Sequence, residues 1–156
     1  MQTISEAAAY TLRFINQTQR SVFLTGKAGT GKTTLLREII ETTHKNTVVV
    51  APTGIAALNS GGVTIHSLFQ LPFGGFLPDN SAPDFSESTK FETKATLRRH
   101  FKMSGLKKSV IRNMELLIID EVSMLRADLL DAMDFMMQTV RKKKQSVWWR
   151  SGVVYW

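Results

Sequence analysis

The residues that most constrain the fold of this chain are GKAGTGKT, at positions 26–33. They fit the pattern G-x-x-x-x-G-K-[ST] and stand between a short apolar run at 21–25 and a helical pattern at 32–43. Glycines in such a turn let successive backbone N–H groups converge on an anion, and the positive end of the next helix adds to the attraction. A glycine turn that matches by chance is the alternative, which the complete strand–turn–helix context argues against. The segment predicts a phosphate-binding loop in an α/β fold.

Individual positions of this loop have separate predicted roles. Gly26, Gly29 and Gly31 are the positions where a Cβ would hinder the backbone. Lys32 is placed to reach the β- and γ-phosphates of a nucleotide, and the hydroxyl of Thr33 is placed to bind Mg²⁺. Lys27 stands at a position that the pattern does not reserve for phosphate, and we interpret it as a surface residue.

A second candidate site follows the apolar run LLII, in the segment LLIIDE at 116–121. Four apolar residues predict a buried strand, and ligands of open α/β sheets bind at the carboxyl ends of strands. Asp120 is predicted to hold Mg²⁺ through water, and Glu121 to act as the general base on a water molecule. The alternative is an acidic pair that only caps a strand. Together with the phosphate loop, the pair predicts binding and hydrolysis of ATP or GTP.

Short apolar runs alternate with helical patterns along the chain, which predicts a parallel sheet with helices on both faces. We expect strands at 21–25, 47–51 and 116–120, and helices at 3–18, 32–43, 55–58 and 125–141. Residues 71–88 hold all but one of the prolines and predict a long loop. A methionine-rich stripe on the last helix is expected to fill the core rather than bind a ligand. Its members are Leu129, Met133, Met136, Met137 and Val140.

Composition limits the function classes. The chain has 156 residues, a single-domain length, and 43% of them are hydrophobic. Its lack of cysteine excludes disulfides and thiolate metal sites and favours a reducing cytosol. No apolar run approaches the roughly 18 residues that a membrane span needs. The net charge of +7 is concentrated at 90–112 and 141–144, and such runs are more often solvated faces than binding sites for a polyanion.

Residues 51–72, APTGIAALNSGGVTIHSLFQLP, join the two candidate sites to a family. With GKAGTGKTT and LLIIDEVSML they resemble the Pif-one-like branch of superfamily-one DNA helicases, which are relatives of the RecD group. The resemblance implies a RecA-like P-loop ATPase that uses ATP and Mg²⁺ to unwind DNA in the 5′ to 3′ direction. It also implies single-stranded DNA and duplex junctions as partners, work in DNA repair and telomere maintenance, and a place in a bacterial cytosol or nucleoid. It leaves the oligomeric state open.

The resemblance assigns residues position by position. The implied nucleotide-binding residues are Gly26, Gly29, Thr30, Gly31, Lys32, Thr33 and Thr34, the implied metal-binding residues are Thr33 and Asp120, and the implied catalytic residues are Lys32 and Glu121. The implied DNA-binding residues are Pro52, Thr53, Gly54, Thr64, His66 and Ser67. Backbone amides and small hydroxyls at these positions suit a motor that follows phosphates without reading sequence. For His66, a buried imidazole bonded to the backbone is the alternative.

Two departures from the family pattern shape the expected activity. Gln17 and Gln19 are poorly placed to be the glutamine that reads adenine in many helicases. A motif with a glutamine that senses the γ-phosphate, and a second RecA-like domain with an arginine finger, should follow residue 144. We therefore expect residues 1–144 to be an incomplete RecA-like domain that binds nucleotide with negligible turnover, because an arginine finger contributes about 10³- to 10⁵-fold in rate.

Two other function classes stay open at this point. The first is a small P-loop nucleotide kinase, for which Arg98, Arg99 and Arg112 would have to clamp the acceptor phosphate. That reading leaves the segment at 51–72 unexplained. The second is a non-catalytic remnant that binds DNA or a protein partner. A motor's affinity for DNA depends on bound nucleotide, whereas the affinity of a remnant does not.

Residues 145–156, QSVWWRSGVVYW, hold all three tryptophans and depart from the family pattern. Codons permitted for 146–150, read one nucleotide later, give Pro-Phe-Gly-Gly and the start of Val, which resembles the family's next strand. We expect an out-of-frame tail. We also expect exposed edges and poor stability, unless residues 153–155 insert as a substitute strand. The gene tests this reading: codons whose next frame does not encode Pro-Phe-Gly-Gly exclude the frameshift.

Overall fold

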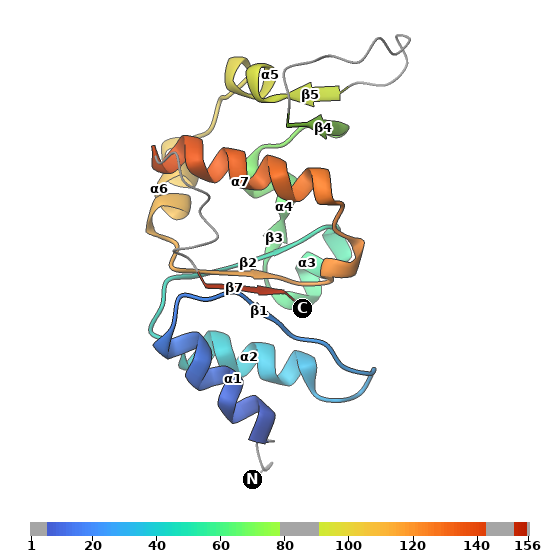
Figure 1. The fold of residues 1–156 in the computed structure, drawn as a ribbon, viewed down its shortest axis with the longest axis vertical. Coiled ribbons are helices and arrows are strands. Elements are labelled where there is room, and N and C mark those ends of the chain that lie inside the picture. The colour runs from blue at the N-terminus through green and yellow to red at the C-terminus, as the bar shows by residue number, and fades with distance from the viewer. Residues whose placement is uncertain (1–5, 79–90, 143–151, 156) are drawn as a thin grey trace.

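A computed structural model describes residues 6–78, 91–142 and 152–155 of the chain (Figure 1). Its main sheet has five strands, all parallel, in the order β1, β7, β6, β2, β3. Their bounds are β1 Val22–Phe23, β2 Thr47–Ala51, β3 Val63–Thr64, β6 Leu116–Ile119 and β7 Gly152–Tyr155. The predicted parallel α/β architecture is therefore confirmed.

Helices cover both faces of this sheet (Figure 1). On one face lie α1 (Glu6–Gln17) and α2 (Lys32–Thr42), and on the other lie α4 (Ile65–Phe69), α6 (Gly105–Asn113) and α7 (Ala127–Arg141). The short helix α3 (Gly54–Ser60) connects β2 to β3, and the 3₁₀ helix η1 (Val122–Met124) follows β6. The helix predicted over 3–18 is α1, which spans Glu6–Gln17; residues 3–5 lie outside the described part of the chain.

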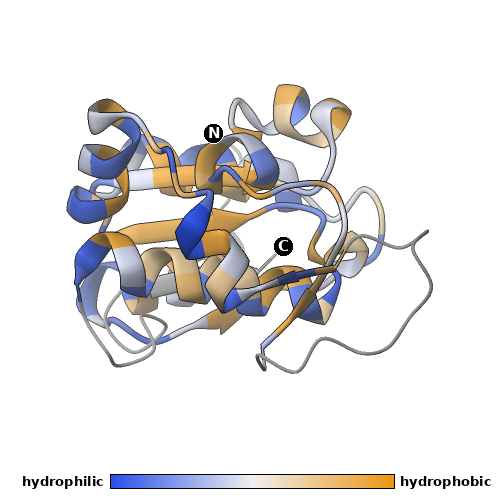
Figure 2. Ribbon diagram, turned by 90° about the horizontal axis from the view of Figure 1, so that it is seen from above, coloured by the Kyte–Doolittle hydropathy of each residue, from blue (hydrophilic) through white to orange (hydrophobic). Residues whose placement is uncertain are grey.

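The central strand β6 is buried along its whole length and contributes to two separate cores. Leu116 and Ile118 pack toward α1 and α2, in a cluster with Ile15, Leu36 and Ile39. Leu117 and Ile119 face the opposite side, because successive residues of a strand point to opposite faces. Figure 2 shows the result, with hydrophobic residues concentrated on the central strands and hydrophilic ones toward the periphery.

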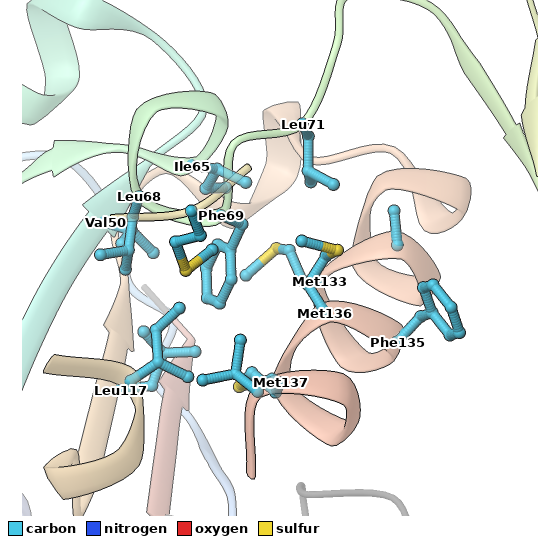
Figure 3. Close-up of a cluster of buried hydrophobic side chains, with 14 of the residues drawn as sticks. Val50, Ile65, Leu68, Phe69, Leu71, Leu117, Met133, Phe135, Met136 and Met137 are labelled. Atoms are coloured by element: carbon cyan, nitrogen blue, oxygen red, sulfur yellow. The ribbon is translucent and has the colours of Figure 1, made fainter. Parts of the chain in front are cut away.

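The larger core lies between the sheet and α7 (Figure 3). Met133, Met136 and Met137 of α7 are at most 2% exposed and lie near Phe69 and Leu117. The prediction that the methionine stripe fills the core is confirmed. Unbranched thioether side chains fit the irregular space between a twisted sheet and a helix.

Two arginines of the predicted basic runs join the C-terminal ends of α6 and α7. The Arg141 guanidinium donates to the carbonyl oxygens of Ile111 at 2.9 Å and Met114 at 2.6 Å. Arg112 donates in return to the carbonyl oxygen of Val140 at 3.2 Å. These bonds satisfy carbonyl groups that helix ends leave without intrahelical partners. Part of the basic surplus therefore stabilises the fold.

The predicted long loop at 71–88 is wrong for one part of that segment. Residues Gly75–Leu77 form strand β4, which pairs in parallel with β5 (Phe91–Thr93) ahead of α5 (Lys94–Arg99). Residues 79–90 lie outside the described part of the chain. Phe76 is buried and stacks on Phe135 of α7, with ring centroids 6.4 Å apart. Packing against a distant helix therefore gives this segment a structure that its local pattern does not indicate.

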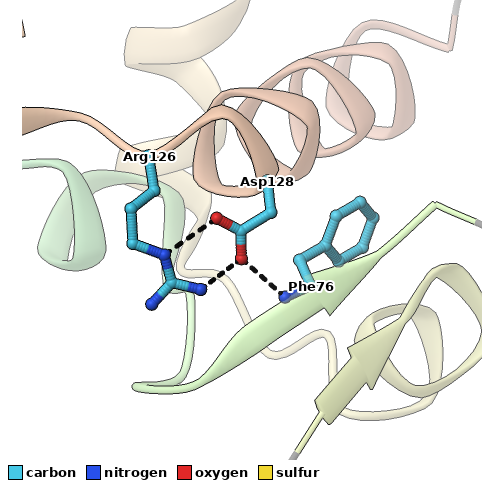
Figure 4. A network of polar contacts seen from close by, with 3 residues as sticks. All are labelled: Phe76, Arg126 and Asp128. Atoms are coloured by element: carbon cyan, nitrogen blue, oxygen red, sulfur yellow. Dashed lines mark hydrogen bonds and ion pairs between the residues drawn. The ribbon is translucent and has the colours of Figure 1, made fainter. Parts of the chain in front are cut away.

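A polar network fixes β4 to the beginning of α7 (Figure 4). The Asp128 carboxylate accepts from the backbone N–H of Phe76 at 2.9 Å and from Arg126 Nε at 2.9 Å. Burial opposes ionisation of Asp128, but the Arg126 and Phe76 hydrogen bonds hold its pKa below the ordinary value. A carboxylate in the first turn of a helix also interacts favourably with the helix dipole.

Strand β7 lies inside the main sheet, between β1 and the central strand β6. It pairs with β1 at Val22↔Val154 and with β6 over four positions, from Leu116↔Gly152 to Ile119↔Tyr155. Residues of the predicted out-of-frame tail thus form the substitute strand, which the sequence predicts as the alternative to open sheet edges. The reading frame of the tail and the boundary at residue 144 stay predictions.

We expect removal of residues 152–156 to destabilise the chain strongly, because β1 and β6 would both lose their paired neighbour and expose backbone donors and acceptors. Size-exclusion chromatography and thermal unfolding measure the effect, with removal of Trp156 alone as the control that keeps β7 whole. A shortened chain that stays monomeric with an unchanged melting temperature would contradict the pairing.

Candidate nucleotide and DNA site

The turn between β1 and α2 has the backbone that a phosphate-binding loop requires. Gly29 and Gly31 have φ values of 78° and 83°, in the left-handed region that residues with a Cβ rarely adopt. A Cβ at Gly26 would lie 2.9 Å from Oγ1 of Thr30. The three glycines singled out in the sequence therefore stand where the backbone geometry or close packing excludes a side chain.

Lys32 and Thr30 order the inside of this turn. The Lys32 ammonium donates to the carbonyl oxygens of Gly26 at 2.9 Å and Lys27 at 3.0 Å, and the Thr30 hydroxyl donates to the same Lys27 oxygen at 2.7 Å. Helix α2 begins at Lys32 without a side-chain cap. A lysine ammonium and the uncapped N-terminus of an 11-residue helix thus meet at one loop, an arrangement suited to an anion.

The acidic pair stands at the carboxyl end of β6. Asp120 is only 9% exposed, and its backbone N–H donates to Val50 of β2 at 2.9 Å, so it extends the strand pairing by one residue. Its Oδ1 accepts from the Glu121 N–H at 2.9 Å. Glu121 is exposed and has a φ of 55°, which is uncommon for a residue with a side chain. Backbone strain of this kind concentrates at functional sites.

Burial raises the pKa of Asp120 above the ordinary aspartate value, and the nearby Glu121 charge raises it further. The hydrogen bond from the Glu121 N–H acts in the opposite direction. The fold therefore holds a carboxylate in surroundings that penalise its negative charge. A bound cation would remove that penalty.

The sheet topology brings the two candidate sites to one place. Parallel strands have their carboxyl ends at the same edge, so the turn after β1 and the pair after β6 share that edge. Leu116 and Ile118 face α2, and Asp120 follows in the same alternation and so faces the same side of the sheet. The first turn of α2 carries Thr33. Among the described residues no cluster of three or more His, Asp or Glu could hold a metal alone. Mg²⁺ commonly uses one or two carboxylates and completes its shell with phosphates and water, so these residues fit Mg²⁺ with a nucleotide.

The two segments predicted to contact DNA lie beside each other at this edge. Strands β2 and β3 are paired at Ala51↔Thr64, so the chain leaves both strands at the same level. The Thr53 hydroxyl accepts from Ala56 N–H at 3.2 Å and caps α3, and the Thr64 hydroxyl accepts from Ser67 N–H at 3.2 Å and caps α4. Each hydroxyl keeps its own hydrogen as a donor for a phosphate oxygen. Pro52 is half-buried, and Gly54 and Ser67 are exposed.

His66 does not fit the alternative of a buried imidazole bonded to the backbone. It is half-exposed, and its ring stacks on that of Phe73 with centroids 4.7 Å apart and planes 19° apart. Burial, and after it the charge of Arg126, lowers the pKa of His66. Neutral imidazole can stack on aromatic rings and can donate or accept one hydrogen bond.

Sequence reasoning missed three residues around these segments. Lys107 of α6 donates to the Ser67 carbonyl oxygen at 2.7 Å, and Phe73 forms the stack on His66. Gly62 packs so closely on β2 that a Cβ there would lie 2.4 Å from the Val49 carbonyl oxygen. Only the glycine pair at 61–62 gave a signal in the sequence, whereas Lys107 and Phe73 depend on contacts between distant segments.

Comparison with known proteins decides the family. The model of the PIF1-like helicase family matches residues 4–153. The chain belongs to the PIF1-like helicase family. It is similar to the ATP-dependent DNA helicase PIF1 of Saccharomyces cerevisiae, with 38% identity over 130 residues. That alignment covers 80% of this chain and 13% of the yeast protein.

Solved structures of PIF1-like helicases give the same result for the fold. A Bacteroides sp Pif1 in complex with ADP-AlF4 has 37% identity and a TM-score of 0.80, over 99% of this chain and 32% of that one. A Bacteroides Pif1 bound to single-stranded DNA has 38% identity and a TM-score of 0.80, over 100% of this chain and 32% of that one. The chain thus spans about a third of these helicases and has their RecA-like fold. No helix in the described residues is long and apolar enough to cross a membrane.

We expect Asp120→Asn to stabilise the fold in metal-free buffer at neutral pH. Because the pKa of Asp120 is raised on folding, the folded chain binds more protons than the unfolded chain at pH values between the ordinary and the raised pKa. The free energy of unfolding therefore falls as pH rises through that interval. A neutral amide removes this cost and can still accept the Glu121 N–H. The gain should shrink as pH falls below the ordinary aspartate range, where both states carry a protonated carboxyl.

Thermal unfolding of the two proteins across pH, with and without Mg²⁺ and ATP, measures this effect. The variant should also lose the extra stabilisation that Mg²⁺ gives in the presence of ATP. Asp131→Asn changes an exposed carboxylate of α7 and is the control. A variant that is less stable than the unchanged chain at neutral pH would show that the Asp120 charge does not oppose folding.

Proposed function

We propose that the chain binds ATP with Mg²⁺ and single-stranded DNA as the first RecA-like part of an ATP-driven DNA helicase. One observation carries the proposal. The phosphate-binding turn, the acidic pair and both predicted DNA segments emerge from the same edge of one parallel sheet. Family membership and the nucleotide and single-stranded DNA in the Bacteroides structures support it.

Within the nucleotide site each residue has a distinct task. Backbone N–H groups of the loop and of the first turn of α2, which includes Thr34, surround the phosphates with Gly26, Gly29, Thr30 and Gly31. Lys32 exchanges its carbonyl partners for phosphate oxygens, which bind an ammonium more strongly because they are charged. Thr33 and Asp120 hold Mg²⁺, which neutralises phosphate charge. Glu121 accepts a proton from the attacking water.

Strand β2 provides a direct connection between hydrolysis and DNA. It pairs with β6 on one side and with β3 on the other, and its last residue precedes the DNA segment at 52–54. A change of charge at the metal site can therefore reach the segment at 52–54 through strand β2. DNA affinity that depends on nucleotide follows from this connection.

Substitutions separate nucleotide binding from water activation. Lys32→Ala should weaken ATP binding roughly 10- to 100-fold, through loss of a charge-assisted contact. Glu121→Gln should leave ATP affinity within about twofold, because a base is needed for the water and not for the phosphates. Isothermal titration with Mg²⁺ and ATP measures both, and Lys27→Ala is the control within the same loop. Equal loss of affinity in the Lys32 and Glu121 variants would contradict the separate roles.

Binding to labelled oligonucleotide tests the DNA part. Affinity should be independent of base sequence, should change when ATP and Mg²⁺ are added, and should fall steeply between low and physiological salt because phosphate contacts dominate. A DNA affinity that does not change when ATP and Mg²⁺ are added would favour the non-catalytic remnant. Phosphate transfer to mononucleotide acceptors would favour the kinase. Two of the arginines that a kinase would need for its acceptor phosphate are engaged elsewhere. Arg112 donates to the Val140 carbonyl oxygen, and the Arg98 guanidinium lies over the Phe135 ring, 5.2 Å from its centroid.

A further inference from the structure

Phe73, just after α4, is an aromatic residue whose ring is open to solvent. It is 87% exposed, yet it lies against the imidazole of His66 with centroids 4.7 Å apart. Exposure by itself carries little weight, since Ile55, Leu58 and Leu106 are also highly exposed. Phe73 differs from these residues because one of its faces is held by a planar partner, so the ring is oriented before any ligand arrives.

Two basic side chains lie near this stack. Lys107 is anchored to the carbonyl oxygen of Ser67, the residue after His66, by a 2.7 Å hydrogen bond to a neutral group, so its charge is not balanced by that contact. Arg126 is near enough for its charge to act on His66, although it also forms an ion pair with Asp128. Lys107 therefore brings to α4 a positive charge that its bond to the Ser67 carbonyl does not neutralise.

The hydroxyl of Thr64 and the exposed Ser67 lie at the beginning of the same helix. An oriented aromatic face, a cation and hydroxyl donors on one short segment match what single-stranded nucleic acid requires. Its bases stack on aromatic rings, and its phosphates accept hydrogen bonds and attract cations. Simple protection of His66 explains the contact less well, because a ring that is 87% exposed removes little surface from water.

We propose that Phe73, supported from behind by His66, is a base-stacking platform for single-stranded DNA, with Lys107 on the adjacent phosphate. The inference rests on the proposed function and adds to it a stacking contact with a base, which does not depend on the hydrogen-bonding groups of that base. Every base has a π-face, so the platform accepts all four. Pro72 precedes Phe73, and its ring fixes the φ of the residue next to the aromatic.

Two probes with the same phosphates separate stacking from charge: an oligothymidine of about 12 nucleotides and an abasic strand of equal length. The unchanged chain should bind oligothymidine about 5- to 100-fold more tightly than the abasic strand. Phe73→Ala should remove most of this preference and leave abasic affinity unchanged. Phe73→Trp should keep it, whereas Phe73→Leu, which is apolar without a π-face, should not.

Tyr10→Ala removes an aromatic that is 60% exposed on α1, on the other face of the sheet, and is the matched control. An equal loss for both probes in Phe73→Ala, or an unchanged preference, overturns the platform while DNA binding stands. Rescue by leucine overturns it as well, because an apolar cover is then sufficient. If the unchanged chain binds neither probe at low salt, the proposed function fails and the platform with it.

Discussion

The pairing of β6 with β2 is the constraint on which the rest of this structure depends. Four register pairs, from Thr47↔Leu116 to Val50↔Ile119, join the two strands, and the Asp120 N–H continues the pairing to Val50. This pairing fixes the level at which β6 ends relative to β2. A slip by one residue would turn Asp120 to the opposite face of the sheet, because side chains alternate along a strand. The proposed metal site and the proposed DNA segments thus depend on one register.

Strand β6 can keep that register because it is buried on both sides. Its four side chains are divided between two cores, with Leu36 and Ile39 on one face and Phe69 and Met133 on the other. Fully desolvated strands bind their neighbours strongly, since an unpaired backbone group away from water is costly. Rigid support of this kind compensates for two energetically unfavourable residues that follow the strand. Asp120 is a buried carboxylate, and Glu121 has a positive φ.

The sequence predicts most of this central part for identifiable reasons. The sequence predicts strand β2 at its observed bounds because TVVVA is apolar after its first threonine, and it predicts α2 because the glycine turn and the apolar helix face agree. The phosphate loop was found because its glycines are required by backbone geometry, which leaves a pattern in the letters. Patterns of this kind reflect local physics and can be read without knowing the tertiary structure.

Other parts depend on contacts between residues far apart in the chain, and those were missed or misread. Strand β4 has only three residues, and Phe76 belongs to it because Asp128, 52 residues later, accepts its N–H. In the sequence, Arg112 and Arg141 are only members of basic runs. In the structure, each donates to a carbonyl group of the other's helix.

The DNA segments combine both kinds of information. Thr53 and Thr64 are predictable as helix caps from local sequence alone. Their adjacency requires the β2–β3 pairing, which in turn requires Gly62 to lie against Val49. A residue larger than glycine at that point would push the second segment away from the first. The glycine pair at 61–62 therefore supports the proposed DNA site indirectly. It allows two capped helices to begin side by side, with both threonine hydroxyls at the edge of the sheet where the proposed nucleotide site lies.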